Sequence, residues 1–491
     1  MVNLPDGGPQ RTWRDWMAAL GPGAIVASLT IGTGELIFST RAGALFGYRT
    51  LGLFALVLLL KWGLVLASAR HWVYAEEHPL GAWTKLPGPR GWLPWTLLVV
   101  AVPAFPVWVS FHSGTLGTLL GAVTGTRESL GGNASLAWGI GILVLTLVVS
   151  VTGGYARQER FQAVVVALML ISVLVAVAML KPDPMALFRG FLNFGSLEYP
   201  EWARELGEFR GRPVWVEAAT YAGVVGGSGF DYLAYVAWLR DKHGVGAERQ
   251  ESARSLSRLV TVDATVSFVA VFLFSGVFVV CGAMLLGPRH QVPSGSDLLT
   301  LQAQIVSVVG PWLKPLYFAG AFLALGGTLY GTLEVAPAIL REILAAVSPR
   351  GVPWEARRIR SWSLAWCGAG ALLILAGSLV SRWVTGTQEA FNLVALVTPA
   401  NLFTGVLACG WISGLNLWSN VRGHPRVPSL PMAIVLLNIA AAVLFCAVGV
   451  KAIWDQGRAW GIGVIGGCLV AGGIAAVLWN RSRGGRPPMS S

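Results

Sequence analysis

The chain has 491 residues, of which 54% are hydrophobic and 12% are charged, with a net charge of +12. An average soluble domain carries about 25% charged residues. This composition argues against a soluble enzyme, a nucleic-acid-binding protein and a disordered chain. No P-loop and no HExxH motif is present, so we expect neither an ATP-driven pump nor an enzyme, and no bound cofactor. The sequence predicts an all-α integral membrane protein whose main partner is the lipid bilayer.

Apolar segments long enough to cross a bilayer recur along the whole chain. A membrane-spanning helix needs about 20 apolar residues, and the sequence contains twelve such segments. Their connections are mostly short, which predicts one transmembrane domain over 18–480, with a cytoplasmic segment 1–17 before it and a cytoplasmic tail 481–491 after it. The predicted spans are 18–41, 50–72, 92–124, 136–153, 161–180, 214–238, 259–286, 311–345, 361–381, 389–416, 429–450 and 460–480.

The basic residues predict the orientation of these spans in the cell membrane. Cytoplasmic loops of membrane proteins carry an excess of Lys and Arg. If the N-terminus lies inside and the sides alternate, the inner ends of the spans collect 22 Lys and Arg residues and the outer ends collect 13. Long loops count less in this rule, and several of the outer residues lie in the long loop 181–212. We therefore expect both termini to be cytoplasmic.

Two of the predicted spans are interrupted by glycines next to an acidic residue. The first span reads IGTGELIF, with Glu35 after Gly32–Gly34, and the sixth reads GGSGFDYL, with Asp231 after Gly226–Gly229. A charge in mid-membrane costs at least about 2.5–3.5 kcal/mol, so it needs a function or a partner. Glycines favour local unwinding, and unwound backbone offers carbonyl groups and helix ends to ions or polar substrates.

The two interruptions lie five spans apart, at the start of each half of the chain. This spacing is typical of a LeuT-type inverted repeat of five plus five spans with broken helices 1 and 6 and a site near the membrane midplane. The repeats are expected at 18–180 and 214–416, followed by extra helices at 429–480. Spans 1–5 and 6–10 should superpose after about half a turn around an in-plane axis.

Other polar residues inside the spans are candidates for proton coupling. His112 in span three is either a proton carrier or a buried imidazole with a hydrogen-bond partner. Asp263, at the start of span seven, either takes part in coupling or pairs with Arg254 or Arg258. For Glu334 in span eight, the sequence favours neither a role in coupling nor a purely structural role. Lys61 in span two either neutralises an acid or extends its amine towards the membrane surface.

Several sequence blocks resemble the Nramp family of proton-coupled divalent-metal transporters. LGPGAIVASLTIGTGELIFSTRAGALFGY is similar to the family's first span, RLVTVDATVSFVAVFLFSGVFVV to its seventh, and GGTLYGTLEVAPAILREI to its eighth, while QERFQAVVV resembles the start of its fifth. The order and spacing of these blocks also match. The resemblance implies the inverted-repeat fold and a secondary transporter that works by alternating access.

The metal-binding motifs of the family are altered in this sequence. The family's Asp-Pro-Gly-Asn in span one corresponds to Gly32–Glu35, so the ligand Asp is absent and Glu35 stands in place of the ligand Asn. The family's Met-Pro-His in span six corresponds to Phe230–Tyr232, and the acid of its third span corresponds to His112. The resemblance therefore supports the architecture more strongly than it supports the usual substrate.

The chemistry of the altered site favours a hard cation. Two carboxylates, backbone carbonyls and hydroxyl groups form a site of oxygen ligands, which suits Mg²⁺ or Ca²⁺ better than a late transition metal. We expect a divalent cation of the Mg, Ca and Mn class, with protons as a hypothetical coupling ion. The alternatives are a transporter of a non-metal solute such as an organic cation or an amino acid, and a sensor that no longer transports. The candidate binding residues are Gly32, Thr33, Glu35, Gly227, Ser228, Phe230, Asp231 and Tyr232, of which Glu35 and Asp231 are the candidate metal ligands.

Overall fold

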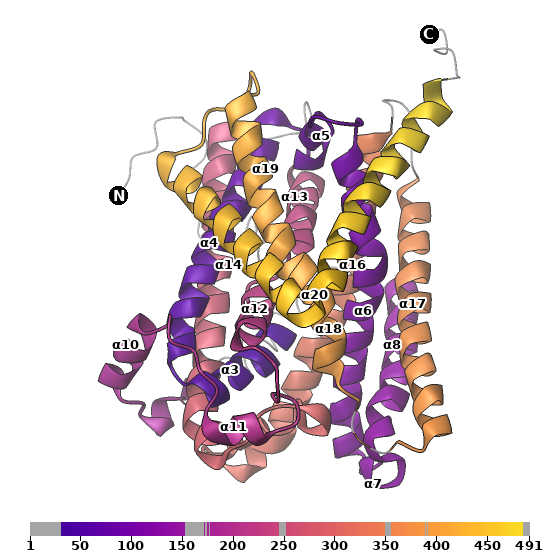
Figure 1. Cartoon of the computed structure of the whole chain (residues 1–491). Helices are drawn as coiled ribbons and strands as arrows, with labels where there is room; N and C mark the ends of the chain where they lie inside the picture. The colour runs from indigo at the N-terminus through magenta and orange to yellow at the C-terminus, as the bar shows by residue number, and fades with distance from the viewer. Residues whose placement is uncertain are drawn as a thin grey trace.

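The computed structural model describes residues 31–152, 171, 174–175, 177–244, 252–348, 355–387, 389 and 391–484. Within these residues the chain forms a bundle of long helices, with short helices gathered at the two ends of the bundle (Figure 1). The described part contains no strand, only an isolated bridge between His424 and Val427. In the part of the chain that the structure describes, eight helical segments are long and apolar enough to cross a membrane, as expected for a multi-pass membrane protein.

The long helices account for most of the predicted spans. They are helical because a segment inside a bilayer must satisfy its own backbone hydrogen bonds. Helix α14 (Ala253–Cys281) continues into a π-helical stretch, and helix α19 (Ala408–Arg422) follows one. Such stretches are frequent near functional sites. The elements that form the described spans after the first are α4 (Arg49–Ala75), α6 (Trp92–Val123), α8 (Ala134–Thr152), α12 (Val214–Val224), α13 (Gly229–His243), α14 (Ala253–Cys281) with the π-helix η4 (Gly282–Leu286), α16 (Lys314–Val347), α17 (Ala356–Thr385), α18 (Leu393–Asn401), the π-helix η8 (Leu402–Leu407), α19 (Ala408–Arg422) and α20 (Met432–Gly484).

Short helices connect the long ones at both ends of the bundle. Two of them begin with an N-cap whose side chain accepts a backbone N–H: His78 before α5 and Asp183 before α10. The short helices are α5 (Pro79–Trp83), α7 (Arg127–Leu130), η2 (Gly131–Asn133), α10 (Pro184–Leu192), α11 (Glu201–Glu205), η5 (Gly287–Arg289), η6 (Gly295–Asp297), α15 (Ala303–Ser307) and η7 (Pro311–Leu313).

The predicted first span is partly described and differs from the expectation of unwound backbone at 32–34. Gly32 lies in a turn, but Thr33 is already helical, and Gly34–Ser39 form a π-helix (η1) that continues into α3 (Thr40–Phe46). The prediction of unwinding at Thr33 and Gly34 was therefore wrong: the wider π turn accommodates both residues with helical backbone. The N-terminal half of this span, the segment 1–17 and most of 161–180 lie outside the described residues.

The last two predicted spans are the two halves of α20. They meet at Arg458, whose backbone is non-helical with a φ of 51°. The two halves form the V-shaped pair of helices at the C-terminal end of the chain in Figure 1. The tail predicted from 481 onwards begins as the final turn of α20, and the rest of it lies outside the described residues.

Close packing between helices depends on glycines that face a neighbouring backbone. A Cβ atom added at Gly43 in α3 would lie 2.1 Å from the carbonyl oxygen of Val279 in α14, and one at Gly282 would lie 2.2 Å from that of Thr40. Helix association in a membrane relies on such small residues, because lipid supplies no hydrophobic drive between helices. Span one is thus held tightly against span seven.

A buried ionic network ties α3 to α12 and to the loop before α12. The guanidinium of Arg41 donates to Glu217 at 2.7 Å, to the carbonyl oxygen of Pro293 at 2.9 Å, and to Glu208. Arg212 lies 2.9 Å from the other oxygen of Glu217. Arg41 and Glu217 are fully buried, so each charge requires the other.

Candidate functional site

The sixth span is broken where the sequence predicts it. Helix α12 ends at Val224, Val225 is extended, and α13 begins at Gly229. Gly226 and Gly227 have φ values of +82° and +95°, a region that residues with a side chain rarely enter. The prediction of unwound backbone at 226–229 is confirmed at its first positions, and Gly229 is already the first residue of α13.

Asp231 is fixed by a capping box at the start of α13. Its Oδ2 accepts the backbone N–H of Ser228 at 2.6 Å, and its own N–H donates to the Ser228 Oγ at 3.4 Å. A carboxylate in the first turn of a helix also interacts favourably with the helix dipole. The carboxylate is therefore held in one orientation at the break.

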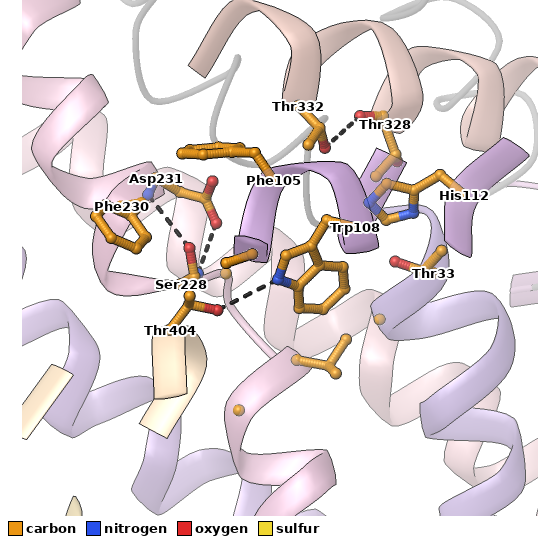
Figure 2. A pocket seen from close by; sticks show the side chains of 15 residues that line it. Thr33, Phe105, Trp108, His112, Ser228, Phe230, Asp231, Thr328, Thr332 and Thr404 are labelled. Atoms are coloured by element: carbon orange, nitrogen blue, oxygen red, sulfur yellow. Dashed lines mark hydrogen bonds between the residues drawn. The ribbon is translucent and has the colours of Figure 1, made fainter. Parts of the chain in front are cut away.

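A cavity of about 50 Å³, counted for the centres of water-sized molecules, lies beside this break. That volume holds a small ion or a few water molecules. Figure 2 shows Asp231 and Ser228 on one side of the cavity and His112 and Thr33 on the other, with Trp108 between them. The lining residues are Thr33, Gly34, Ala104, Phe105, Trp108, His112, Gly223, Val224, Gly227, Ser228, Phe230, Asp231, Thr328, Thr332 and Thr404.

The polar groups that line the cavity are mainly oxygen atoms. Hydroxyl groups come from Ser228, from Thr33 just before η1, and from threonines of α16 and η8, and the only carboxylate among the lining residues is that of Asp231. No lining residue carries sulfur. Among the described residues, no group of three or more His, Cys, Asp or Glu side chains is arranged to hold a metal ion. The cavity therefore suits a cation that keeps part of its hydration shell.

Aromatic rings form one wall of the cavity. The rings of Phe105 and Phe230 lie 5.6 Å apart, and the indole N–H of Trp108 donates to Thr404 at 3.2 Å. His112 stacks on Trp108 with ring centroids 5.5 Å apart, and its Nδ1 has no hydrogen-bond partner among the described residues. The ring of His112 is thus positioned by packing at the edge of the cavity.

Glu35 does not share this cavity with Asp231. Its side chain is fully buried and accepts a hydrogen bond from the Ser275 hydroxyl of α14 at 3.2 Å, while its Oε2 has no partner among the described residues. The expectation that both carboxylates line one cavity was wrong, because the π turn directs Glu35 towards span seven. Gly32 is also absent from the lining, since it packs against Thr328.

Lys61 and Tyr232 occupy the carbonyl groups of the break. The ammonium of Lys61 donates to the carbonyl oxygens of Gly223, Val225 and Gly227 at 3.0, 2.8 and 2.7 Å. The Tyr232 hydroxyl donates to that of Gly226 at 2.6 Å. Tyr232 therefore supports the break and does not line the cavity. Lys61 therefore does not extend its amine towards the membrane surface, which was one of its two interpretations.

The other coupling candidates lie away from the cavity. Asp263 is buried and accepts a hydrogen bond from the Tyr235 hydroxyl at 2.9 Å, which links α13 to α14. Glu334 pairs with Arg360 of α17 at 2.6 Å. Of the residues considered for coupling, only His112 lines the cavity.

Sequence reasoning did not identify the residues that complete the lining. Thr328 and Thr332 come from α16 and Thr404 from η8, where each hydroxyl also bonds a carbonyl four residues earlier. Threonine is too common in apolar spans to indicate a site. Aromatic residues such as Phe105 and Trp108 are equally common there, so they do not indicate one either. Only the fold brings them next to Asp231.

The fold and the site together define a multi-pass helical membrane protein whose sixth span breaks beside a cavity that the carboxylate of Asp231 lines. A family model described as natural resistance-associated macrophage protein-like matches residues 23–401. The chain belongs to this family, the Nramp family.

Individual relatives agree with this assignment. The chain is 22% identical over 336 residues to the divalent metal cation transporter MntH of Levilactobacillus brevis, covering 65% of this chain and 67% of that one. The structure is similar to that of the Eremococcus coleocola manganese transporter, with a TM-score of 0.70, 13% identity and coverage of 97% and 96% of the two chains. It is also similar to MhsT, solved in complex with L-phenylalanine, with a TM-score of 0.53, 17% identity and coverage of 88% and 98%. Both likenesses concern the fold.

Proposed function

We propose that this protein is a secondary transporter that moves a hard divalent cation of the Mg²⁺ class across the cell membrane by alternating access. Family membership supports transport of a metal ion, and the relative and the structural neighbour bear the names of a divalent metal cation transporter and a manganese transporter. Both termini are proposed to be cytoplasmic, on the basis of the distribution of Lys and Arg.

The observation that carries the choice of ion is the position of Asp231. Its carboxylate lines the cavity at the break of span six, among threonine and serine hydroxyls and without a thiol or thioether. Mg²⁺ usually retains several waters and binds through one or two carboxylates. A single carboxylate, hydroxyl groups and space for a few waters fit this mode better than they fit a dehydrated late transition metal.

The surrounding charges also favour a cation. Lys61 interacts electrostatically with both Glu35 and Asp231. When all three are ionised, the group has one negative charge more than positive. A cation in the cavity offsets this excess, whereas an anion would add to it.

Protons are proposed as the coupling ion, with His112 as the carrier. The imidazole lines the cavity, and no described residue accepts or donates a hydrogen bond at its Nδ1. A neutral imidazole changes its charge near physiological pH when unperturbed, which makes it suited to this role.

The test is a substrate screen with purified protein in liposomes. Uptake of Mg²⁺, Ca²⁺ and Mn²⁺ is followed with dyes inside the vesicles, and uptake of methylammonium and amino acids with labelled solutes. The proposal predicts saturable uptake of Mg²⁺ or Ca²⁺, with only a small preference for Mn²⁺ over these ions. Uptake of Mn²⁺ with strong rejection of Mg²⁺ and Ca²⁺ would contradict the hard-ligand interpretation.

A second candidate substrate is a small organic cation. The aromatic wall of Phe105, Trp108 and Phe230 favours it, because a cation is attracted to the face of an aromatic ring. In the same screen, saturable uptake of methylammonium without uptake of any divalent ion would identify this class. A protein that takes up nothing, but binds one of these cations, would be a sensor.

A further inference from the structure

The side chain of Lys61 makes an unusual set of contacts for a residue inside a membrane-spanning helix. It extends from α4 into the break of span six and is fully buried. Its Nζ lies 3.0, 2.8 and 2.7 Å from the carbonyl oxygens of Gly223, Val225 and Gly227, respectively. All three partners are backbone atoms, and they come from the last turn of α12 and from the unwound segment after it.

This geometry requires the charged form of Lys61. An ammonium group has three N–H donors and no acceptor. A neutral amine has only two N–H bonds, so it could not donate to three carbonyl oxygens at once. The C-terminal end of α12, which carries the negative end of its helix dipole, adds to the stabilisation of this positive charge.

The three carbonyls form an enclosure that a free cation could use. Carbonyl oxygens arranged around one point replace the hydration shell of K⁺ in channels. Unwound carbonyls and the C-terminal ends of half-helices hold small cations in transporters with broken helices. In this protein the same kind of enclosure is already filled, and the Tyr232 hydroxyl takes the remaining carbonyl of the break, that of Gly226.

We propose that the carbonyl oxygens of Gly223, Val225 and Gly227 form a monovalent-cation site that Lys61 fills with its own ammonium group. The lysine acts as a permanently attached cation that holds the broken helix in shape. Removing it leaves a site for a small free cation such as ammonium, methylammonium or potassium. Lys61 does not line the neighbouring cavity, whereas Gly223 and Gly227 do, so this site adjoins the proposed substrate position, and the ammonium itself lies outside the cavity lining.

The test is chemical rescue of Lys61→Ala in the full-length purified protein. Thermal unfolding is followed by tryptophan fluorescence in chloride salts of ammonium, methylammonium, potassium or N-methylglucamine at equal ionic strength, where N-methylglucamine is too large for the site. We expect Lys61→Ala to unfold at least about 5 °C below the wild type in N-methylglucamine. Ammonium or potassium should then raise its unfolding temperature in a saturable way by at least about 3 °C.

Two variants make the result specific. Lys61→Met fills the space of the side chain without a charge, so it should be destabilised and should not respond to small cations. Lys451→Ala removes an exposed lysine that pairs with Asp455 on α20, so it should behave as the wild type does. An equal response to small cations in Lys61→Ala and Lys61→Met would overturn the proposal.

A further variant separates charge from hydrogen bonding and covers poor folding. Lys61→Gln retains N–H donors without a charge, and the proposal predicts a lower unfolding temperature than in the wild type. A Lys61→Gln protein as stable as the wild type would show that no cation is needed at this position. If Lys61→Ala aggregates, synthesis into lipid nanodiscs with ammonium or with N-methylglucamine decides: equal yields of monodisperse protein would overturn the proposal. Since each readout is stability or folding, failure here leaves the proposed transport function untouched.

Discussion

Replacing Arg41 by Met should destabilise the protein through the buried ionic network. The guanidinium makes hydrogen bonds to Glu217, Glu208 and the carbonyl of Pro293, and it lies 4.7 Å from the centre of the Phe209 ring. The variant keeps most of the side-chain volume but removes the charge and all three hydrogen bonds. The network then loses its link between span one, span six and the loops that carry Glu208 and Pro293.

The magnitude follows from what the change leaves behind. Removing one partner of a buried ion pair costs about 3–5 kcal/mol, because the other charge stays buried without compensation. Here Glu217 retains Arg212 at 2.9 Å and the Tyr221 hydroxyl at 2.8 Å, so its charge is partly compensated. We therefore expect a loss near the lower limit, about 3 kcal/mol of the free energy of unfolding.

The assay is denaturation by sodium dodecyl sulfate in mixed micelles, followed by tryptophan fluorescence. Arg127→Met is the matched control, because Arg127 pairs with Asp297 at 2.8 Å while both side chains remain 44% exposed. An exposed pair contributes about 0–1 kcal/mol. If Arg41→Met loses no more free energy of unfolding than Arg127→Met, the network does not stabilise the fold and the reasoning is refuted.

Three further substitutions test the site and the packing. Glu35→Gln should change uptake by less than about threefold, since this side chain does not line the cavity beside Asp231; abolished uptake in the liposome assay would place Glu35 in the transport pathway. His112→Gln should remove proton influx while substrate uptake continues, as measured with a pH-sensitive dye inside liposomes, and an unchanged ratio of the two fluxes would exclude this residue as the carrier. Gly43→Ala should lower the unfolding temperature, because its Cβ would lie 2.1 Å from the carbonyl oxygen of Val279, whereas Gly141→Ala meets nothing within 4 Å and should be neutral or slightly stabilising. Equal unfolding temperatures of these two glycine variants would contradict the packing argument.

The architecture was predictable from the sequence because its signals are long and repeated. Hydrophobic length defines each span, and the glycines before Asp231 mark the break in span six since only glycine adopts the required backbone at low cost. The kink at Arg458 was anticipated only as a connection between two spans. The π-helix at Gly34–Ser39 was not, because the same glycines are compatible with unwound and with helical backbone.

The site was less predictable because its members come from distant spans. Asp231, Ser228 and His112 could be named in advance as polar residues in apolar helices. The direction of Glu35 towards Ser275 depends on a local widening of the helix, which no pattern in the sequence encodes. The three carbonyl partners of Lys61 are backbone atoms, so residue types alone could not indicate them.

The central claim is that a hard cation binds at the carboxylate of Asp231. At a charge separation of about 4 Å and an effective dielectric constant of about 20, this carboxylate contributes about 4 kcal/mol per unit charge of the cation. Asp231→Asn retains an oxygen that can accept the Ser228 N–H, so the break should keep its shape.

The most direct measurement is Mg²⁺ binding by calorimetry to the wild type, to Asp231→Asn and to the control Asp455→Asn, whose carboxylate lies on α20. We predict that Asp231→Asn lowers the affinity for Mg²⁺ by at least about 10³-fold and that Asp455→Asn leaves it unchanged. Equal Mg²⁺ affinity in the wild type and Asp231→Asn would contradict the claim.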